Sequence, residues 1–447
     1  MSKPTILFFA RGYQAGFFPE LQSEKYQSVF ATLTSAERRV VERKGGRVVG
    51  CFEEEFERIK PASVRPDYLV TSLMSDRFLG RFSRAERMEI LGKEIAFWRR
   101  ILESCSPVAV VNELVAIEIS EVLLIEARLR GVRYLAGLNC LVDDYFYWLG
   151  NPLSLSGEHL EMPDPGKDAR ARAQSYAREL LTNDYRPFYV KNLRGRLSPF
   201  VLGVSLAKLL YWKLNRLWSA LSGRFLYEIY DDEYAKKVVV YLKGLVLRYD
   251  SLEDVPADAE VVFYPLHQEP EATLNYMSEF YSNQVSTIEN ILKCLTPVQV
   301  LVVKEHPVDK GSLLQRKFRD LRAACSGLYF LPAEVHGREV LARAHRVVTL
   351  TSTVGWEAVV MGREVLVLGT IFYDRFDGAR FVNDFKALRR ELRRPAMSSP
   401  PRIEAVEQFV ASMAQQSWPG NPFPHGGLYT PLNRQRVIDA IVHGAGL

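Results

Sequence analysis

Short apolar runs alternate with helical patterns along most of this 447-residue chain. Such alternation is typical of an α/β protein with parallel sheets, because two neighbouring parallel strands need a crossover helix between them. In the first part of the chain, apolar runs of strand length are separated by longer stretches with helical periodicity. The predicted strands are Thr5–Phe9, Arg47–Cys51, Tyr68–Ser72, Val108–Asn112 and Val132–Ala136, and the predicted helices include Arg84–Cys105 and Ile117–Arg130.

The same alternation returns after residue 250 and predicts a second, doubly wound unit. Its predicted strands are Val261–Tyr264, Val298–Lys304, Leu328–Leu331, Arg346–Leu350 and Val365–Leu368, and its predicted helices are Met277–Cys294, Gly311–Cys325, Gly337–Ala344 and Trp356–Gly362. Between the two parts lie two helical patterns, a charged one at Asp168–Leu181 and a Leu-rich one at Val201–Leu221. We therefore expect an α/β fold that is GT-B-like, with two Rossmann-like domains facing across a cleft and joined by a helical bridge.

These changes of pattern place the domain boundaries. A chain of this length is too long for one core and suits two domains of roughly 200 residues each. We expect an N-terminal Rossmann-like domain at residues 1–165, a helical bridge at 166–250 and a C-terminal α/β domain at 251–390. Residues 391–447 turn Pro-rich and polar, contain helical patterns at Ile403–Gln415 and Asn433–His443, and are expected to form a C-terminal extension.

Composition narrows the class of protein. The formal net charge of +5 suits an anionic substrate or an anionic membrane face, and we expect no nucleic-acid partner. The five cysteines are scattered without a CxxC pair, so neither a disulfide framework nor a zinc site is predicted. The first apolar run is too short for a signal peptide, and no stretch reaches the ~18 apolar residues of a membrane span. We expect a cytoplasmic protein that could also contact the inner membrane peripherally.

Three polar segments of the second part each follow a predicted strand. They are the segments Tyr264–Glu271, Lys304–Pro307 and Thr349–Glu357. Open α/β sheets bind ligands just beyond the carboxyl ends of parallel strands, so we expect these segments to meet at one ligand site.

The segment Lys304-Glu305-His306-Pro307 places a cation and an imidazole directly after an apolar strand. Pro307 turns the chain out of the strand and prevents it from continuing as a helix. In that position His306 is able to donate a hydrogen bond to a phosphate and to pass a proton to a leaving group. The alternative is that His306 is an ordinary residue of a surface turn.

The segment Thr351-Ser352-Thr353 places three hydroxyls before a predicted helix. Hydroxyls beside the free N–H groups of a helix start are able to bind an anion. Glu357, in the first turn of that helix, is a candidate to cap it or to bind ribose hydroxyls. Helix capping without a ligand is the alternative for the whole segment.

Taken together, these segments resemble the bacterial capsule and lipopolysaccharide β-Kdo glycosyltransferases, relatives of sialyltransferase-like enzymes that use CMP-sugars. The resemblance covers about residues 260 to 375 and reaches the first half only in outline. It rests on Pro265-Leu266-His267 with Pro270-Glu271, on Lys304-Glu305-His306-Pro307, on Thr351-Ser352-Thr353-Val354-Gly355 with Glu357-Ala358, and on Gly369 and Tyr373.

The resemblance implies a transferase that moves Kdo, or a related keto-sugar acid, from CMP-Kdo to a bacterial surface glycan or glycolipid. It implies no metal, and the sequence has no Asp-x-Asp with ligand-like surroundings. Retention of configuration through a covalent sugar–carboxylate intermediate would fit this activity. The residues expected to bind the donor are His267, Lys304, His306, Thr351, Ser352, Thr353 and Glu357. A transferase using a UDP or GDP donor and a non-catalytic glycan assembly protein remain as alternatives.

The catalytic carboxylate is expected in the first half, which also holds the acceptor. Glu113 follows the apolar run at 108–111, and Asp143-Asp144 follows the strand predicted at 132–136. Asp144 leads into the aromatic run Tyr145-Phe146-Tyr147-Trp148, which we expect to stack on sugar rings. Glu158 and Asp232 are weaker candidates, and a helix cap or a solvated loop is the alternative for each acid.

The helical pattern at Val201–Phe225 mixes leucines and tryptophans with the cations Lys208, Lys213, Arg216 and Arg224. Helical spacing gathers five leucines, at 206, 210, 214, 217 and 221, on one stripe. A basic amphipathic helix of this kind is able to lie in an anionic headgroup layer. The alternative is that the stripe packs on the protein's own core.

Overall fold

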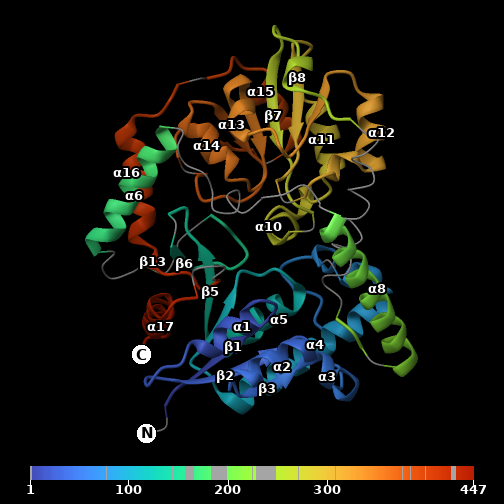
Figure 1. The fold of residues 1–447 in the computed structure, drawn as a ribbon, viewed down its shortest axis with the longest axis vertical. Coiled ribbons are helices and arrows are strands. Elements are labelled where there is room, and N and C mark those ends of the chain that lie inside the picture. Colours follow the sequence, from blue (N-terminus) through green and yellow to red (C-terminus); the bar gives the residue numbers. More distant parts are fainter. Residues whose placement is uncertain are drawn as a thin grey trace.

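The chain folds around two β-sheets, one in each half, which lie one above the other along the long axis of the molecule (Figure 1). The computed structural model describes residues 3–156 without 77 and 143, 166–182, 199–223, 225–227, and 248–447 without 270, 308, 375, 383, 398 and 424–428. The α/β fold with two Rossmann-like sheets is confirmed.

The first sheet has seven strands in the order β13-β6-β5-β4-β1-β2-β3. Its parallel strands are β1 (Thr5–Phe9), β2 (Gln27–Thr32), β3 (Val48–Cys51), β4 (Ala109–Glu113) and β5 (Arg133–Asn139). Two antiparallel strands, β6 (Tyr145–Leu149) and β13 (Trp418–Pro419), extend the edge next to β5. The strand order reverses between β1 and β4, so the carboxyl ends of these two strands open on a crevice.

Helices cover this sheet on both faces. They are α1 (Gln14–Phe17), α2 (Ser35–Arg43), α3 (Phe52–Glu55), α4 (Arg84–Cys105) and α5 (Glu118–Leu129). The longest of them, α4, begins at a capping box in which Ser83 and Glu86 satisfy each other's backbone N–H groups. Its buried face carries Phe97, Trp98 and Ile101, and Trp98 stacks edge-on against Phe9 of β1.

The second sheet has six strands, all parallel, in the order β12-β11-β10-β7-β8-β9. The strands are β7 (Glu260–Pro265), β8 (Gln299–Lys304), β9 (Leu328–Leu331), β10 (Ala344–Thr349), β11 (Glu364–Val367) and β12 (Ala379–Phe381). The helices are α10 (Ala272–Asn275), α11 (Gln284–Leu292), α12 (Arg316–Ala324), α13 (Gly337–Arg343), α14 (Val354–Val360) and α15 (Phe385–Leu392). The order reverses between β7 and β10, which places a second crevice at their carboxyl ends.

The C-terminal segment returns to the first half. Helix α16 (Ile403–Gln415) packs against α6 (Gly166–Leu181), and α17 (Pro431–Ala445) packs on the first sheet. The indole of Trp148 on β6 donates to the carbonyl of Ala440 in α17 at 3.1 Å. Residues from the end of the chain therefore complete the sheet that the beginning of the chain starts.

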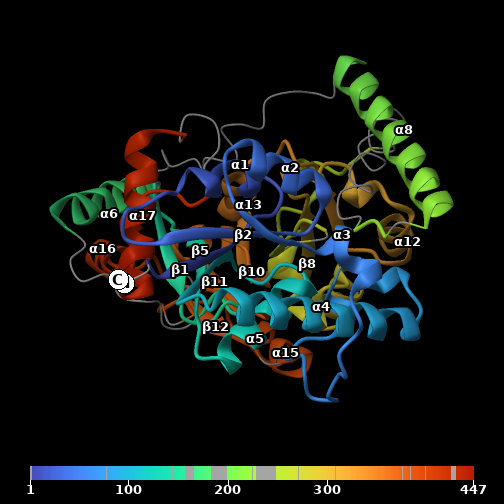
Figure 2. The same ribbon diagram turned by 90° about the horizontal axis from the view of Figure 1, so that it is seen from below.

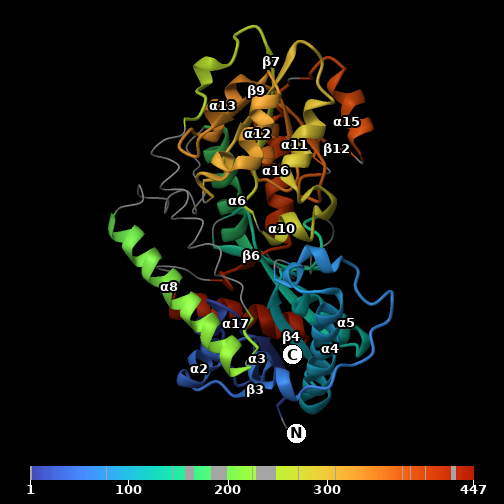
Figure 3. The same ribbon diagram turned by 90° about the vertical axis from the view of Figure 1, so that its right-hand side faces the viewer.

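Helix α8 (Pro199–Ser222) stands apart from both sheets, at one side of the molecule (Figures 2 and 3). Its exposed residues include Leu206, Leu210, Leu214, Leu217 and Leu221. The alternative that this leucine stripe packs on the protein's own core is therefore wrong. No helix among the described residues is long and apolar enough to cross a membrane.

Several sequence expectations differ from the structure. Residues 68–72 form no strand, because the backbone N–H groups of Val70 and Thr71 donate to the carboxylate of Glu121 instead of to a neighbouring strand. The helix expected from residue 277 begins only at Gln284, where the Asn283 side chain caps it. The strand β2 was not expected at all.

Candidate functional site

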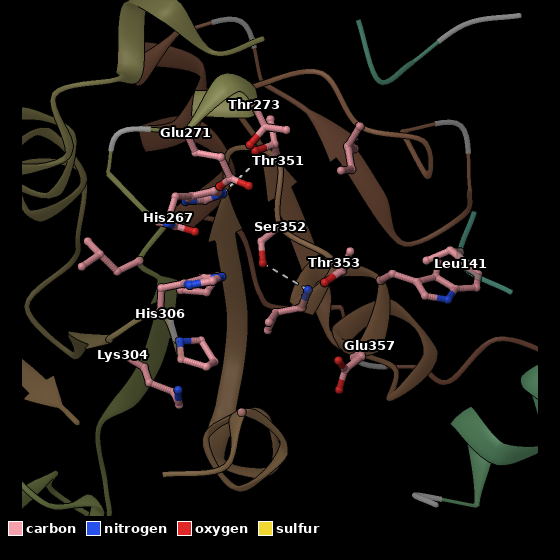
Figure 4. A pocket seen from close by; sticks show the side chains of 18 of the residues that line it. Leu141, His267, Glu271, Thr273, Lys304, His306, Thr351, Ser352, Thr353 and Glu357 are labelled. Atoms are coloured by element: carbon pink, nitrogen blue, oxygen red, sulfur yellow. Dashed lines mark hydrogen bonds between the residues drawn. The ribbon is translucent and has the colours of Figure 1, made fainter. Parts of the chain in front are cut away.

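A cavity of about 700 Å³ lies between the two halves of the chain. The second half contributes the loops after β7, β8 and β10 and the beginning of α14. The cavity therefore opens at the strand-order reversal between β7 and β10. The opposite wall comes from the end of β5, from β6, and from α6 and α16. The three polar segments expected at one ligand site do meet there, with His267, His306 and Ser352 facing the same space (Figure 4).

His267, in the loop after β7, is held by two elements at once. Its backbone N–H donates to the side-chain oxygen of Gln284 at 2.7 Å, and the Gln284 amide donates back to the His267 carbonyl at 2.9 Å. Its Nε2 accepts a hydrogen bond from the backbone N–H of Thr351 at 3.1 Å, which joins the loops after β7 and β10.

The protonation of His267 follows from these contacts. Burial, reinforced by the neighbouring His306, lowers the pKa of His267 to about 3, so the ring is neutral at neutral pH. Because Nε2 is an acceptor, the single ring proton lies on Nδ1. That Nδ1 atom is buried and has no hydrogen-bond partner among the residues that the structure describes, so His267 offers an N–H donor to a ligand.

Lys304 and His306 lie at the end of β8. The Lys304 ammonium donates to the carbonyls of Glu305 at 3.0 Å and Ala333 at 3.2 Å, and burial lowers the pKa of Lys304 to about 8. Burial and the Lys304 charge lower the pKa of His306 to about 4. At neutral pH Lys304 is therefore mostly charged and His267 and His306 are neutral, and a bound anion would raise the pKa of His306.

Glu305, between these two residues, has a structural role. Its buried carboxylate accepts hydrogen bonds from the Tyr249 hydroxyl at 2.7 Å and from the backbone N–H groups of Gly311 and Leu313, each at 2.9 Å. These bonds hold residues 311–313 in a turn, which is why the helix expected from residue 311 begins only at Arg316.

The segment Thr351–Thr353 connects β10 to α14. Ser352 Oγ accepts a hydrogen bond from the Val354 N–H at 3.1 Å. One hydrogen bond of this hydroxyl therefore stabilises the start of α14. Thr351 lines the cavity, and its buried Oγ1 has no hydrogen-bond partner in the described part of the chain. Because α14 has only seven residues, we expect an anion at this segment to be bound by its hydroxyls and backbone N–H groups rather than by a helix dipole.

Glu357 is committed to an ion pair. Its carboxylate lies 3.2 Å from Nε of Arg338, whose Nη2 donates to the carbonyl of Leu180 in α6 at 2.9 Å. Burial raises the pKa of Glu357, and Arg338 opposes that shift. Glu357 lines the cavity, but its main contact ties α14 to α13 and α6.

Gly355 lets Tyr373 hold the Thr351–Thr353 segment. The Tyr373 hydroxyl donates to the Ser352 carbonyl at 2.7 Å, and a Cβ at position 355 would collide with that hydroxyl. We expect Gly355→Ala to destabilise the protein by about 1–3 kcal/mol through overpacking, because the Tyr373 ring is fully buried. Urea denaturation measures this loss. Gly16→Ala, where a Cβ meets nothing within 4 Å, is the control, and equal stability of the two variants would contradict the packing argument.

Glu113 lies at the end of β4, as expected, and at the strand-order reversal of the first sheet. It forms an ion pair with Arg11 and accepts a hydrogen bond from the Gln14 amide at 3.1 Å, and its side chain is 19% exposed. Asp144 occupies the turn between β5 and β6 at φ 65°, lies 3.6 Å from Arg172, and is 42% exposed. Neither residue is among those that line the cavity.

The first half contributes no described carboxylate to the cavity wall. Its lining residues are Leu138, Asn139, Cys140, Leu141, Tyr147 and Leu155. The four lining carboxylates, Glu271, Glu305, Glu334 and Glu357, all belong to the second half. Asp143, Glu158 and Asp232 lie outside the described residues. Within the described part of the chain, no group of three or more His, Cys, Asp or Glu side chains is placed to hold a metal ion.

The aromatic run expected to stack on sugar rings is mostly core. Phe146 and Trp148 are fully buried in a cluster with α17, because alternate residues of β6 point to the face that α17 covers. Tyr147 is the member of the run that lines the cavity. Sequence reasoning also missed Gln284 and Arg338, whose roles depend on contacts with distant segments.

Residues 225–398 match the family described as capsule polysaccharide biosynthesis protein. The match covers less than half of the chain, and it shows that this region is similar to that family. The capsule polysaccharide biosynthesis region contains all three loops of the cavity that follow β7, β8 and β10. The resemblance given by the motifs at 265–271, 304–307 and 351–358 is thereby confirmed for this region.

Similarity to individual proteins is more limited. A stretch of 138 residues is 30% identical to Protein FixF of Sinorhizobium fredii and covers 31% of this chain and 30% of FixF. The β-Kdo 2,7 transferase of Thermosulfurimonas dismutans KpsC aligns over 92% of this chain and 97% of its own, at 12% identity and a TM-score of 0.37. A UDP-GlcNAc 2-epimerase from Neisseria meningitidis aligns over 98% and 100%, at 11% identity and a TM-score of 0.29. These TM-scores are low, and the two structures do not bear on the activity of the chain.

Proposed function

We propose that the protein is a glycosyltransferase that moves Kdo, or a related keto-sugar acid, from a CMP donor to a bacterial surface glycan or glycolipid. One observation carries the proposal: three loops at the carboxyl ends of β7, β8 and β10 bring His267, Lys304, His306 and the three hydroxyls of residues 351–353 to one cavity between the two halves. The match of residues 225–398 to capsule polysaccharide biosynthesis proteins supports a role in making such a glycan.

The donor chemistry fits these groups. CMP-Kdo carries a phosphate diester and a sugar carboxylate, and the cavity offers the Lys304 ammonium, the His267 N–H and the Thr351 hydroxyl. His306 would gain a proton or donate its neutral N–H as the phosphate binds, and it would thus assist departure of CMP. We propose that Lys304, His306, Thr351, Ser352 and Thr353 hold the phosphate, that His267 lies near the phosphate or the carboxylate, and that the transfer needs no metal.

The charge of Lys304 makes donor binding pH-dependent. Because the pKa of Lys304 is about 8 and a bound phosphate would raise it, affinity for CMP should fall by up to about tenfold per pH unit above pH 8. Calorimetric titration of CMP across this range measures the slope. A Lys304→Met protein should bind CMP more weakly at neutral pH and lose the slope, and an unchanged slope in that variant would contradict the assignment.

The carboxylate that takes part in transfer is proposed in the first half, with Glu113 and Asp144 as candidates. Retention of configuration by two displacements would form a covalent bond between this carboxylate and the anomeric carbon as CMP leaves. Mass spectrometry of the protein incubated with donor and no acceptor should find the sugar on a peptide with one of these residues. An adduct on another acidic peptide, or on none, would exclude both as nucleophiles.

Binding of CMP, UDP and GDP separates the proposal from its rivals. The proposal expects CMP to bind most tightly and Lys304→Met and Thr351→Val each to weaken it. Tighter binding of UDP or GDP at the same residues would instead indicate a different sugar nucleotide, and failure of all three to bind would favour a non-catalytic assembly protein.

A further inference from the structure

Helix α8 exposes an unusually large apolar surface. Nine of its large apolar side chains are between 40% and 79% exposed, whereas a surface helix of a globular protein normally buries its apolar face. They are Phe200, Val204, Leu206, Leu210, Tyr211, Leu214, Leu217, Trp218 and Leu221. The helix also projects from the body of the protein, and none of the other helices and strands that the structure describes lies over it (Figures 2 and 3).

These side chains form one continuous face. With 3.6 residues per turn, the nine residues fall within a sector about 160° wide. Gly203 and Ala207, which are also exposed, lie within the same sector. Trp212, Arg216 and Ser219, which are less exposed, lie on the opposite side of the helix. The helix therefore turns its most apolar side outward and its more polar side toward the protein.

The charges on α8 follow the same geometry. The apolar sector contains no charged residue, and the exposed Lys208 and Lys213 lie one on each edge of it. The sequence of Pro199–Ser222 contains no Asp or Glu. Lysines at the edges of an apolar face are able to extend their ammonium groups to a lipid phosphate layer while their stems stay in contact with the apolar surface.

We infer that α8 docks the protein on an anionic lipid bilayer. The helix would lie parallel to the membrane plane, with its leucine face and Trp218 among the upper acyl chains and with Lys208 and Lys213 at the lipid phosphates. Charge complementarity favours this occupant over a second copy of the chain, because two α8 faces packed together would bring the edge lysines of both copies close to one another. The inference rests on α8 and does not depend on the proposed donor.

Co-sedimentation of the full chain with vesicles tests the inference. Wild-type protein should pellet with vesicles of phosphatidylcholine and phosphatidylglycerol and much less with phosphatidylcholine alone. Lys208→Gln with Lys213→Gln should weaken binding about thirtyfold, since each cation near such a surface contributes about fivefold. Leu210→Gln with Leu214→Gln should weaken it by at least a hundredfold, and glutamine preserves helix propensity.

Matched controls use residues elsewhere on the surface. Lys25→Gln with Lys60→Gln removes two exposed lysines. Leu129→Gln with Leu432→Gln removes two exposed leucines. Neither pair of substitutions should change vesicle binding. Circular dichroism of each variant checks that the helices remain. Vesicle binding that is equal in wild type and both α8 variants would overturn the inference, as would an absence of wild-type binding.

Fluorescence of Trp218 provides a second readout. On addition of anionic vesicles, emission should shift to shorter wavelength and be quenched by brominated acyl chains, and Trp218→Phe should remove most of that change while Trp418→Phe should not. Self-association in solution that the leucine variants abolish, with no quenching by brominated lipid, would show that a second copy is the occupant and would contradict the bilayer.

Discussion

A His306→Ala protein should fold normally and lose roughly thirty- to a hundredfold in kcat/KM for the CMP donor, because a charge-assisted contact to a bound phosphate is worth about 2–3 kcal/mol. His306 lines the cavity next to Lys304, and its buried ring is neutral until an anion arrives. Loss of the ring therefore removes both a hydrogen-bond donor and the group that would transfer a proton to CMP as CMP leaves.

Steady-state kinetics with varied donor measures this loss, and His443→Ala is the control because that imidazole is exposed in α17, far along the chain from the cavity loops. A His306→Asn protein keeps an N–H donor and should recover part of the loss. Wild-type kcat/KM and donor affinity in His306→Ala would show that His306 is only a residue of a turn.

The second large effect concerns stability. Arg346 on β10 is 1% exposed and lies 2.8 Å from the buried carboxylate of Glu364 on β11. Its other nitrogen atoms donate to the carbonyls of Leu392 and Arg394 at the end of α15. Arg346→Met should lower the free energy of unfolding by about 3–5 kcal/mol, since it leaves a buried carboxylate and two carbonyls without this donor.

Chemical denaturation measures this change, and Arg316→Met, which removes an exposed pair with Asp320, should cost less than about 1 kcal/mol. Replacing Arg346 and Glu364 together by apolar residues should be less harmful than Arg346→Met alone, because no buried charge is then left unpaired. Equal stability of Arg346→Met and Arg316→Met would contradict the importance of this network.

The second half was more predictable than the first because its strands are apolar runs that end in polar segments. β8 and β9, for example, coincide almost residue for residue with the predicted runs. β2 escaped prediction because Gln27, Ser28 and Thr32 interrupt its apolar pattern, and β13 because its two residues pair with a strand that lies far away in the sequence. Both β2 and β13 form strands because they are buried in a sheet, and local periodicity does not reveal them.

The candidate site shows the same limit of prediction from sequence, because local motifs can be found and contacts between distant segments cannot. The motifs around His267 and Lys304 could be found from the sequence, since each follows a strand and carries ligand-binding side chains. The tautomer of His267 could not, because it depends on the backbone N–H of Thr351, which lies 84 residues away. For Glu113, the ion pair with Arg11 arises because β4 lies next to β1, and local sequence gives no sign of it. For α8, one amphipathic pattern fits both a core helix and a membrane-surface helix, and its exposure in the fold excludes the core helix.

The most direct test of the central claim is nucleotide release from a panel of activated sugars. Purified protein would be incubated with CMP-Kdo, with UDP-sugars and with GDP-sugars, each with and without a glycolipid acceptor, and the free nucleotide would be quantified by chromatography. We expect release of CMP from CMP-Kdo, faster release with acceptor, and strongly reduced release by the His306→Ala protein. Release of UDP or GDP with no release of CMP, or no release from any donor, would contradict it.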